Sequence, residues 1–292
     1  MPVSNARPHW LRKKLVSSDI ALRTSETLAN LGVNTVCESA LCPNLNECFA
    51  HAHATFLIFG NVCTRGCGFC SVTKGAPPEV DSAEPYRIAE AVKFLKLEYV
   101  VLTSVTRDDL PDGGADQFVK VIEAIRESSG GVGVEVLVPD FRGDIDSVKK
   151  VLGAAPEVFA HNVETVSRLY PAVRSTAYYN RSLTLLANAK LIAPGQIVKS
   201  GLMVGLGENE NEVIDAITDI AHAGCDILTI GQYLRPSKDN VAVERFVTLD
   251  EFELYKKAAL AAGIREVVSG PFVRSSYRAG DIYNNLKTGV SI

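Results

Sequence analysis

Short apolar runs alternate with amphipathic segments along most of this chain of 292 residues. The apolar runs are predicted strands at residues 55–59, 99–104, 132–138, 158–162, 198–204 and 227–232. The amphipathic segments are predicted helices near residues 84–97, 115–128, 144–153, 180–193, 209–223 and 249–262. Because the strands are nearly continuous in Val, Ile and Leu, both of their faces are expected to be buried in a parallel sheet. Repeated units of this kind fold as a β/α barrel or a doubly wound sheet.

Polar segments follow the carboxyl ends of several predicted strands, which favours the barrel. Cys63 follows the first strand, residues 107–109 the second, Glu164 the fourth and Glu208 the fifth. Functional residues on successive βα loops are typical of barrels with an active site at one mouth. Because six units are fewer than eight, the prediction is an α/β fold, a partial (β/α)6 TIM-like barrel at residues 54–265. The barrel is expected to follow an irregular N-terminal extension, 1–53. It is expected to precede a short C-terminal extension, 266–292, which contains a further short strand at 267–270.

Charge and composition narrow the class of protein. The formal net charge of −4 argues against a nucleic-acid partner, because such proteins usually carry a basic excess. No apolar run reaches the roughly 18 residues of a membrane span, and residues 1–16 lack the apolar core of a secretory signal. Clustered cysteines then indicate a reducing compartment, the cytoplasm, where they are more often metal ligands than disulfides. The isolated Cys225 is expected to be a small buried apolar residue.

One cysteine triplet, Cys63, Cys67 and Cys70, has the spacing C-x3-C-x2-C directly after the first predicted strand. Three thiolates hold three irons of a [4Fe–4S] cluster and leave the fourth iron open to another ligand. The glycines at 66 and 68 allow backbone amides to approach the cluster sulfurs. A structural zinc site is the alternative, but it would need a fourth ligand. The motif resembles that of the radical S-adenosylmethionine superfamily, C-x3-C-x-aromatic-C, with Phe69 as the aromatic residue, which implies that S-adenosylmethionine binds the open iron.

The other triplet, Cys37, Cys42 and Cys48, has the spacing C-x4-C-x5-C. By itself it fits a cluster and a Cys3His zinc site equally, since His51 and His53 follow it. The whole segment 37–48, however, is similar to the auxiliary-cluster motif of lipoyl synthases. The resemblance extends over nearly the full chain through residues 7–12, 103–114, 161–165, 200–208, 231–234 and 270–277. Two departures are minor: Arg7 replaces a usual lysine, and Gln117 a common histidine.

The lipoyl synthase resemblance implies roles for individual residues. The auxiliary cluster is implied to take a serine oxygen as its fourth ligand, which we expect from Ser276, with Ser275 second. The alternative is that both serines only cap a turn. The residues implied to bind the cosubstrate are Phe69, Thr103, Ser104, Asn162, Glu164, Arg174, Gly205 and Arg235. The alternative for the charged residues among them is a solvated surface position.

The same resemblance implies the reaction and its partners. Two sulfur atoms would be inserted at C6 and C8 of an octanoyl chain on a lysine of a lipoyl domain or glycine-cleavage carrier protein, with the auxiliary [4Fe–4S] cluster as sulfur donor. An iron–sulfur carrier for cluster repair and an electron donor are implied as well, and a monomer is the default expectation. A basic segment with Arg7, Arg12, Lys13 and Lys14 is a candidate docking patch for an acidic carrier, or else a solvated tail.

Two other function classes remain at this point. One is a radical S-adenosylmethionine enzyme that inserts sulfur into tRNA or a small molecule, for which a basic surface or an extra domain is expected. The other is an iron–sulfur or zinc protein without catalytic activity. A barrel with polar loops at one mouth argues against this class, because electron transfer or a structural role does not require such a site. Cleavage of S-adenosylmethionine would separate the enzymes from the second class.

Overall fold

Seven parallel strands form the main sheet in the computed structural model, which describes residues 8–12, 19–51 and 53–288. They are β1 (Thr55–Ile58), β4 (Tyr99–Ser104), β5 (Gly133–Leu137), β6 (Val158–Ala160), β7 (Ile197–Val204), β8 (Ile227–Gln232) and β9 (Glu266–Gly270). Their order in the sheet is their order in the chain, and every neighbouring pair is parallel. The six predicted strands are therefore confirmed, and the short seventh pairs with β8 as an integral part of the sheet.

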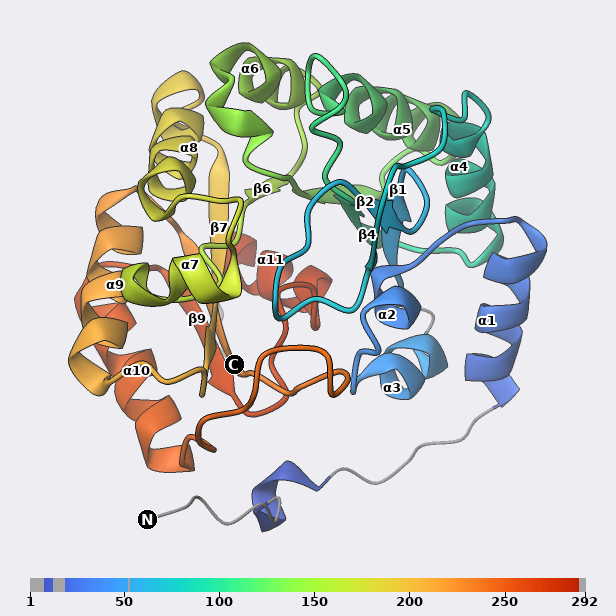
Figure 1. Cartoon of the computed structure of the whole chain (residues 1–292). Helices are drawn as coiled ribbons and strands as arrows, with labels where there is room; N and C mark the ends of the chain where they lie inside the picture. The colour runs from blue at the N-terminus through green and yellow to red at the C-terminus, as the bar shows by residue number, and fades with distance from the viewer. Residues whose placement is uncertain (1–7, 13–18, 52, 289–292) are drawn as a thin grey trace.

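Helices surround the curved sheet (Figure 1). Those that follow successive strands are α4 (Glu84–Phe94), α5 (Ala115–Ser128), α6 (Ile145–Gly153), α8 (Tyr179–Ile192), α9 (Glu210–His222) and α10 (Leu249–Ala261). Strands β1 and β9 are the two edges of the sheet within the described residues, so the barrel is open on one side. This arrangement confirms the partial β/α barrel.

Local sequence explains where these helices begin and which face they bury. Helix α9 starts with a capping box, in which the Asn209 side chain accepts from the Glu212 backbone and the Glu212 carboxylate accepts from the Asn209 backbone. Its buried side carries Val213, Ile217 and Ile220, which recur at helical spacing. No helix in the described part of the chain is long and apolar enough to cross a membrane.

The N-terminal segment is helical where the sequence led us to expect irregular structure. It forms a 3-10 turn (His9–Leu11), α1 (Asp19–Asn30), α2 (Val36–Ser39) and α3 (Leu45–Ala50). Helix α1 buries only Ala21, Thr24 and Leu28, and the Thr24 hydroxyl donates to the Phe49 carbonyl of α3. The amphipathic pattern of α1 is nevertheless about as strong as that of α9, so the expectation of irregular structure was wrong for this segment. The two remaining helices are too short to show any period.

The C-terminal segment crosses back to the N-terminal helices. The Asn44 side chain donates to the Phe272 carbonyl at 2.7 Å, and the Tyr277 hydroxyl donates to Glu47 at 2.7 Å. Helix α11 (Ala279–Thr288) follows and lies behind the centre of the barrel in Figure 1. The ring of its Tyr283 packs against the ring of Tyr99 at the start of β4, with centroids 5.4 Å apart. The segment between β9 and α11 is thereby held beside the first cysteine triplet.

Candidate active site

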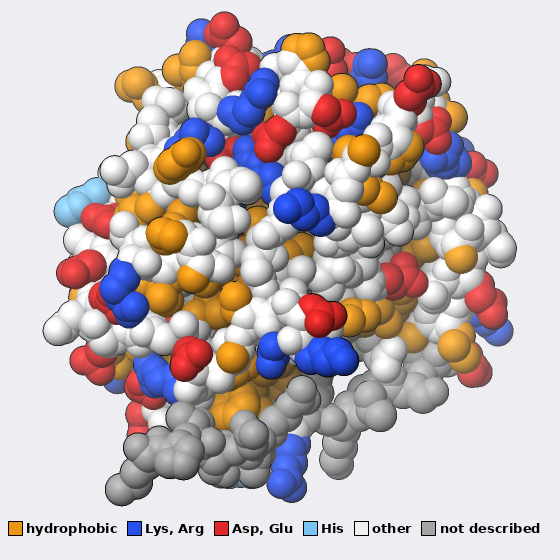
Figure 2. All heavy atoms as spheres, in the orientation of Figure 1, with side chains coloured by type: hydrophobic (Ala, Val, Ile, Leu, Met, Phe, Trp, Pro, Cys, Tyr) orange, Lys and Arg blue, Asp and Glu red, His pale blue; other side chains and the backbone are white. Residues whose placement is uncertain are grey.

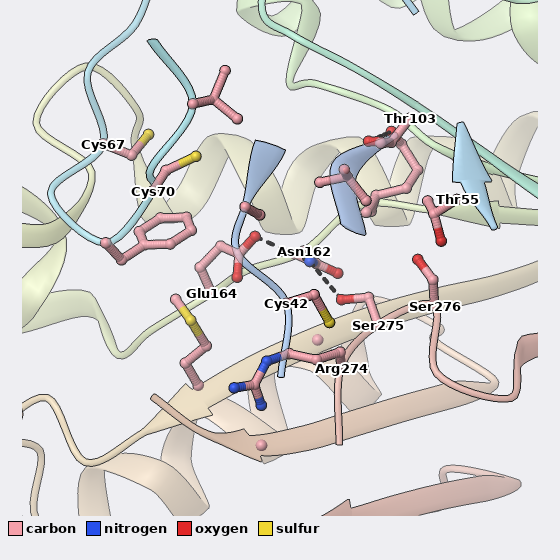
Figure 3. A pocket seen from close by; sticks show the side chains of 18 of the residues that line it. Cys42, Thr55, Cys67, Cys70, Thr103, Asn162, Glu164, Arg274, Ser275 and Ser276 are labelled. Carbon is pink, nitrogen blue, oxygen red and sulfur yellow. Dashed lines mark hydrogen bonds between the residues drawn. The ribbon is translucent and has the colours of Figure 1, made fainter. Parts of the chain in front are cut away.

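A cavity of about 560 Å³ lies at the carboxyl ends of the strands. All six cysteines of the two triplets line it, and so do Ser275 and Ser276. The predicted cosubstrate residues that also line it are Phe69, Thr103, Ser104, Asn162, Glu164, Arg174 and Arg235. Figure 3 shows Cys67 and Cys70 on one side, Cys42 and the serines on another, and Asn162 and Glu164 between them. Gly205 does not line the cavity.

The second triplet lies in a loop whose ends are tied together. Strands β2 (Val62–Cys63) and β3 (Thr73–Lys74) pair in parallel and close the loop that carries Cys63, Cys67 and Cys70. The Cys63 sulfur accepts hydrogen bonds from the Thr106 and Arg65 backbone amides at 3.2 and 3.4 Å. Burial raises the pKa of the Cys67 thiol, and it raises that of Cys70 to about 11. These thiols are therefore poor free nucleophiles, and their thiolates need a metal to stabilise them.

The first triplet is carried by the two short helices and the turn between them. Cys37 lies on α2, Cys48 on α3 and Cys42 in the connection. Burial raises the pKa of Cys37 to about 11. His51 and His53, the residues that would complete a zinc site, are both exposed and neither lines the cavity. The geometry thus favours a cluster over zinc at this triplet.

Both triplets suit iron–sulfur cubanes better than single ions. Each triplet supplies three cysteines, and thiolates are the protein ligands that hold such clusters. Within the described ranges, no three Cys, His or acidic side chains gather closely enough to hold one metal ion. Ligands of a cubane bind separate irons and do not converge on a single point. Spaced thiols that face one cavity match that requirement.

The two serines of the Arg-Ser-Ser-Tyr element have different surroundings. The Ser275 hydroxyl accepts a hydrogen bond from the Asn162 side chain at 2.7 Å, and the same amide group donates to Glu164 at 3.0 Å. Figure 3 shows both contacts as dashed lines. The Ser276 hydroxyl forms no hydrogen bond with any described residue and lines the same cavity. Of the two, Ser276 has the oxygen available for a further ligand.

Several polar atoms at the cavity lack a partner. Ser104 Oγ, Asn162 Oδ1 and Arg174 Nε are buried and have no hydrogen bond to the described residues. Burial raises the pKa of the Glu164 carboxyl group, an effect that the nearby Arg174 partly offsets. Because buried polar groups are normally satisfied, this set indicates a polar ligand that completes it. The Thr103 hydroxyl, by contrast, donates to the Leu137 carbonyl at 2.9 Å.

Two of the predicted cosubstrate residues are used locally. The Arg235 guanidinium donates to the backbone carbonyls of Asn240 and Lys238, within its own loop. Gly205 has a φ of 100°, and its amide donates to the Glu208 carboxylate at 2.5 Å. A Cβ at Gly205 would lie 2.1 Å from the Gln232 amide nitrogen, so the position requires glycine. These contacts shape the loops that surround the cavity.

Arg274 is a cavity residue to which the sequence assigned no role. Among the described residues, its guanidinium forms one hydrogen bond: Nη1 donates to the adjacent Val273 carbonyl at 2.7 Å. Burial lowers its pKa, which the charges of Cys42 and Glu164 partly offset. Figure 3 places the guanidinium below Glu164, next to Cys42. Its position in the Arg-Ser-Ser-Tyr element could have marked Arg274 as a site residue. A guanidinium whose N–H groups point into a cavity suits an anionic ligand.

Comparisons with known proteins agree with this site. The radical SAM superfamily model matches residues 57–220. Among solved structures, the fold is similar to methylornithine synthase, with a TM-score of 0.51 and 16% identity over 94% of this chain and 89% of that one. It is also similar to a maturase of the [FeFe]-hydrogenase, with a TM-score of 0.52 and 18% identity over 87% of this chain and 68% of that one. Fold and cysteine site together define a radical S-adenosylmethionine enzyme.

Full-length similarity then narrows the class. The lipoyl synthase of Rubrobacter xylanophilus is 50% identical over 98% of this chain and 89% of its own length. The lipoyl synthase of Caldanaerobacter subterraneus is 51% identical over 97% of this chain and 99% of its own length. The lipoyl synthase of Caldicellulosiruptor saccharolyticus is 52% identical over 94% of this chain and 96% of its own length. The chain belongs to the lipoyl synthase family.

Proposed function

We propose that this protein inserts two sulfur atoms, at C6 and C8, into an octanoyl chain carried on a lysine of another protein. The observation that carries the proposal is the single cavity that both cysteine triplets and Ser276 line. A radical generated at one triplet and a sulfur source at the other need such a shared space. Membership of the lipoyl synthase family supports the same reaction.

Cys63, Cys67 and Cys70 would hold one [4Fe–4S] cluster, with the methionine end of S-adenosylmethionine at its open iron. When bound, these groups supply the electron and the 5′-deoxyadenosyl radical that can break unactivated C–H bonds. The unpartnered atoms of Ser104, Asn162 and Arg174 would orient the cosubstrate. Glu164 would accept hydrogen bonds from its ribose, as carboxylates do in nucleotide sites, and Phe69 lines the adjacent wall.

Cys37, Cys42, Cys48 and Ser276 would hold the second [4Fe–4S] cluster, which is a substrate because it donates the sulfur. Contacts of Asn44 with Phe272 and of Glu47 with Tyr277 support this assignment, since they fasten the serine segment to the first triplet. We accordingly propose that extension 1–53 and the part of extension 266–292 that follows β9 enclose the sulfur donor against the barrel. Turnover would stop when the sulfur is consumed unless an iron–sulfur carrier restores it.

The cavity walls suit radical chemistry on an alkyl chain. Leu57, Val72, Leu137 and Leu202 contribute apolar side chains to the lining. An apolar wall accommodates the octanoyl chain and excludes water and stray hydrogen donors from a reactive intermediate. The chain's own residues thus bind, orient and shield the reactants.

The remaining partners follow from the reaction. The octanoyl chain would be delivered by a lipoyl domain or a glycine-cleavage carrier protein, and an electron donor would reduce the first cluster. We propose a monomer that acts in the cytoplasm. Arg12 of the candidate docking patch is exposed, whereas Arg7, Lys13 and Lys14 lie outside the described residues. The face drawn in Figure 2 mixes acidic and basic side chains and has hydrophobic atoms among them.

The reaction can be tested directly. Anaerobically reconstituted protein is mixed with S-adenosylmethionine, a strong reductant and an octanoyl-lysine peptide, and the products are followed by mass spectrometry. We expect 5′-deoxyadenosine, together with a peptide that gains first one sulfur and then a second. Deoxyadenosine without sulfur on the peptide would retain the radical site but overturn the octanoyl substrate. No deoxyadenosine from fully iron-loaded protein would overturn the enzymatic function.

Replacement of the serine ligand tests how the sulfur is released. A thiolate binds iron more strongly than a serine oxygen, so Ser276→Cys is expected to keep the iron content and deoxyadenosine formation. Two-sulfur product should fall by roughly tenfold or more, because the tighter ligand holds the cluster intact. Mass spectrometry of the peptide measures this. Ser275→Ala, which removes the partner of Asn162, is the matched control for iron content. Full two-sulfur turnover by Ser276→Cys would show that a labile ligand is unnecessary.

A further inference from the structure

Arg65 lies between the first two cysteines of the second triplet and is tied to two carboxylates. Its Nε and Nη2 atoms donate to the two oxygens of Asp108 at 2.6 and 2.8 Å, and Nη2 also donates to Asp140 at 2.7 Å. The side chains of Arg65 and Asp140 are 5% and 0% exposed. A buried, forked arrangement of this kind fixes the guanidinium in one orientation.

The carboxylates come from two other βα loops. Asp108 follows β4, and Asp140 follows β5, so Arg65 joins the loop after β1 to the loops after the next two strands in the sheet order. Arg181 on α8 approaches the second oxygen of Asp140 at 3.3 Å from the partly exposed side. Two arginines and two carboxylates balance in charge. The fork fixes where the Arg65 guanidinium lies, and the charge of Arg65 also favours the Cys67 thiolate.

The backbone around Arg65 is fastened to the same wall. The Thr64 amide and hydroxyl both donate to the Thr106 carbonyl, at 3.1 and 2.9 Å, and the Asp108 amide donates to the Thr64 hydroxyl at 3.2 Å. The Thr106 amide in turn donates to the Cys63 sulfur. Through these contacts, the placement of Cys63 depends on how residues 64–65 lie against residues 106–108.

The other half of the cysteine loop is held differently. The Gly68 amide donates to the Val173 carbonyl at 2.8 Å, and its carbonyl accepts from the Val241 amide at 2.9 Å. The Asn240 side chain donates to the Cys70 carbonyl at 2.9 Å. Backbone contacts and the Asn240 side chain hold this half, whereas the half that joins Cys63 to Cys67 is anchored by the Thr64 contacts and the buried Arg65 side chain.

We propose that Arg65 is a positioning residue that holds Cys63 and Cys67 in the geometry that receives the cluster. The inference rests on the proposed function, in which the second triplet binds a [4Fe–4S] cluster. Outer partners of metal ligands typically change metal affinity 10- to 100-fold when they are lost. Lysine at position 65 keeps the charge but loses the fork, so it separates geometry from charge.

The test uses the full chain with Cys37, Cys42 and Cys48 replaced by alanine, so that bound iron reports the second triplet alone. In this background, Arg65→Lys is compared with Arg181→Met, which removes the outer partner of Asp140. We expect Arg65→Lys to lose iron to a chelator at least about tenfold faster. After reduction with a strong reductant, its electron paramagnetic resonance signal on addition of S-adenosylmethionine should differ from that of the background. Arg181→Met is expected to behave as the background does. Asp108→Asn, which weakens the same fork, should shift both readouts in the direction of Arg65→Lys.

Three outcomes separate the possibilities. Iron retention and resonance spectra of Arg65→Lys equal to those of the background would overturn the assignment. An equal loss in Arg181→Met would also overturn it, because any disturbance of Asp140 would then suffice. If the background with Arg65 intact binds no iron, the proposed function itself fails, and this assignment fails with it. Thermal unfolding of the metal-free variants, compared with the background, checks that the variants fold.

Discussion

A variant with Cys37, Cys42 and Cys48 replaced by alanine is expected to cleave S-adenosylmethionine but to transfer no sulfur. The two triplets lie on separate segments, one on α2 and α3 and the other on the loop after β1. The unpartnered groups that would orient the cosubstrate come from β4 and from the segment after β6, not from the N-terminal helices. Sulfur transfer should therefore be abolished, whereas deoxyadenosine formation should stay within a few-fold of the parent protein. Mass spectrometry of peptide and nucleoside measures both.

Cys225→Ala is the matched control for this experiment. Cys225 is buried and does not line the cavity, so its replacement should leave both activities intact. Sulfur transfer by the triple variant would contradict the assignment of the first triplet as the donor site. Loss of deoxyadenosine as well would show that the first triplet also shapes the cosubstrate site.

The second large effect is on stability. Lys199 of β7 and Glu135 of β5 form an ion pair at 2.7 Å inside the barrel, and both side chains are 1% exposed. The other Glu135 oxygen accepts from the Tyr99 hydroxyl at 3.1 Å. Lys199→Met leaves the carboxylate buried without its counter-charge, so we expect the free energy of unfolding to fall by about 3–5 kcal/mol. Urea unfolding of the purified protein measures this change.

Two further variants test the cause. Lys149→Met removes an ion pair with Asp146, in which the Lys149 and Asp146 side chains are 54% and 80% exposed. The free energy of unfolding should then fall by less than about 1 kcal/mol. Adding Glu135→Gln to Lys199→Met removes the uncompensated charge and keeps an oxygen for Tyr99, so most of the lost stability should return. A loss below about 1 kcal/mol for Lys199→Met would contradict a dominant role for the buried pair.

Local features of this protein could be predicted from its sequence. The six strands and their helices follow from apolar periodicity, because a strand or helix buried along its length repeats at its own period. The two triplets follow from spacing, since ligands within one loop or one pair of short helices are close by connectivity. Phe69 and the Arg-Ser-Ser-Tyr element were recognised as parts of sequence motifs, because the residues of a motif are also close along the chain. Helix α1 has an amphipathic pattern about as strong as that of α9, so it too could have been predicted from the sequence.

The tertiary structure alone decided how distant groups meet. Asn162 binds Ser275 across 113 residues, and the Ser276 hydroxyl forms no hydrogen bond with the described residues, whereas the sequence offered two adjacent serines. Arg65 reaches Asp140 across 75 residues. The Arg235 guanidinium binds carbonyls of its own loop, whereas among the described residues the Arg274 guanidinium binds only the Val273 carbonyl. Spacing along the chain carries no information on such pairs, because their distances depend on sheet order, loop path and the packing of the whole barrel.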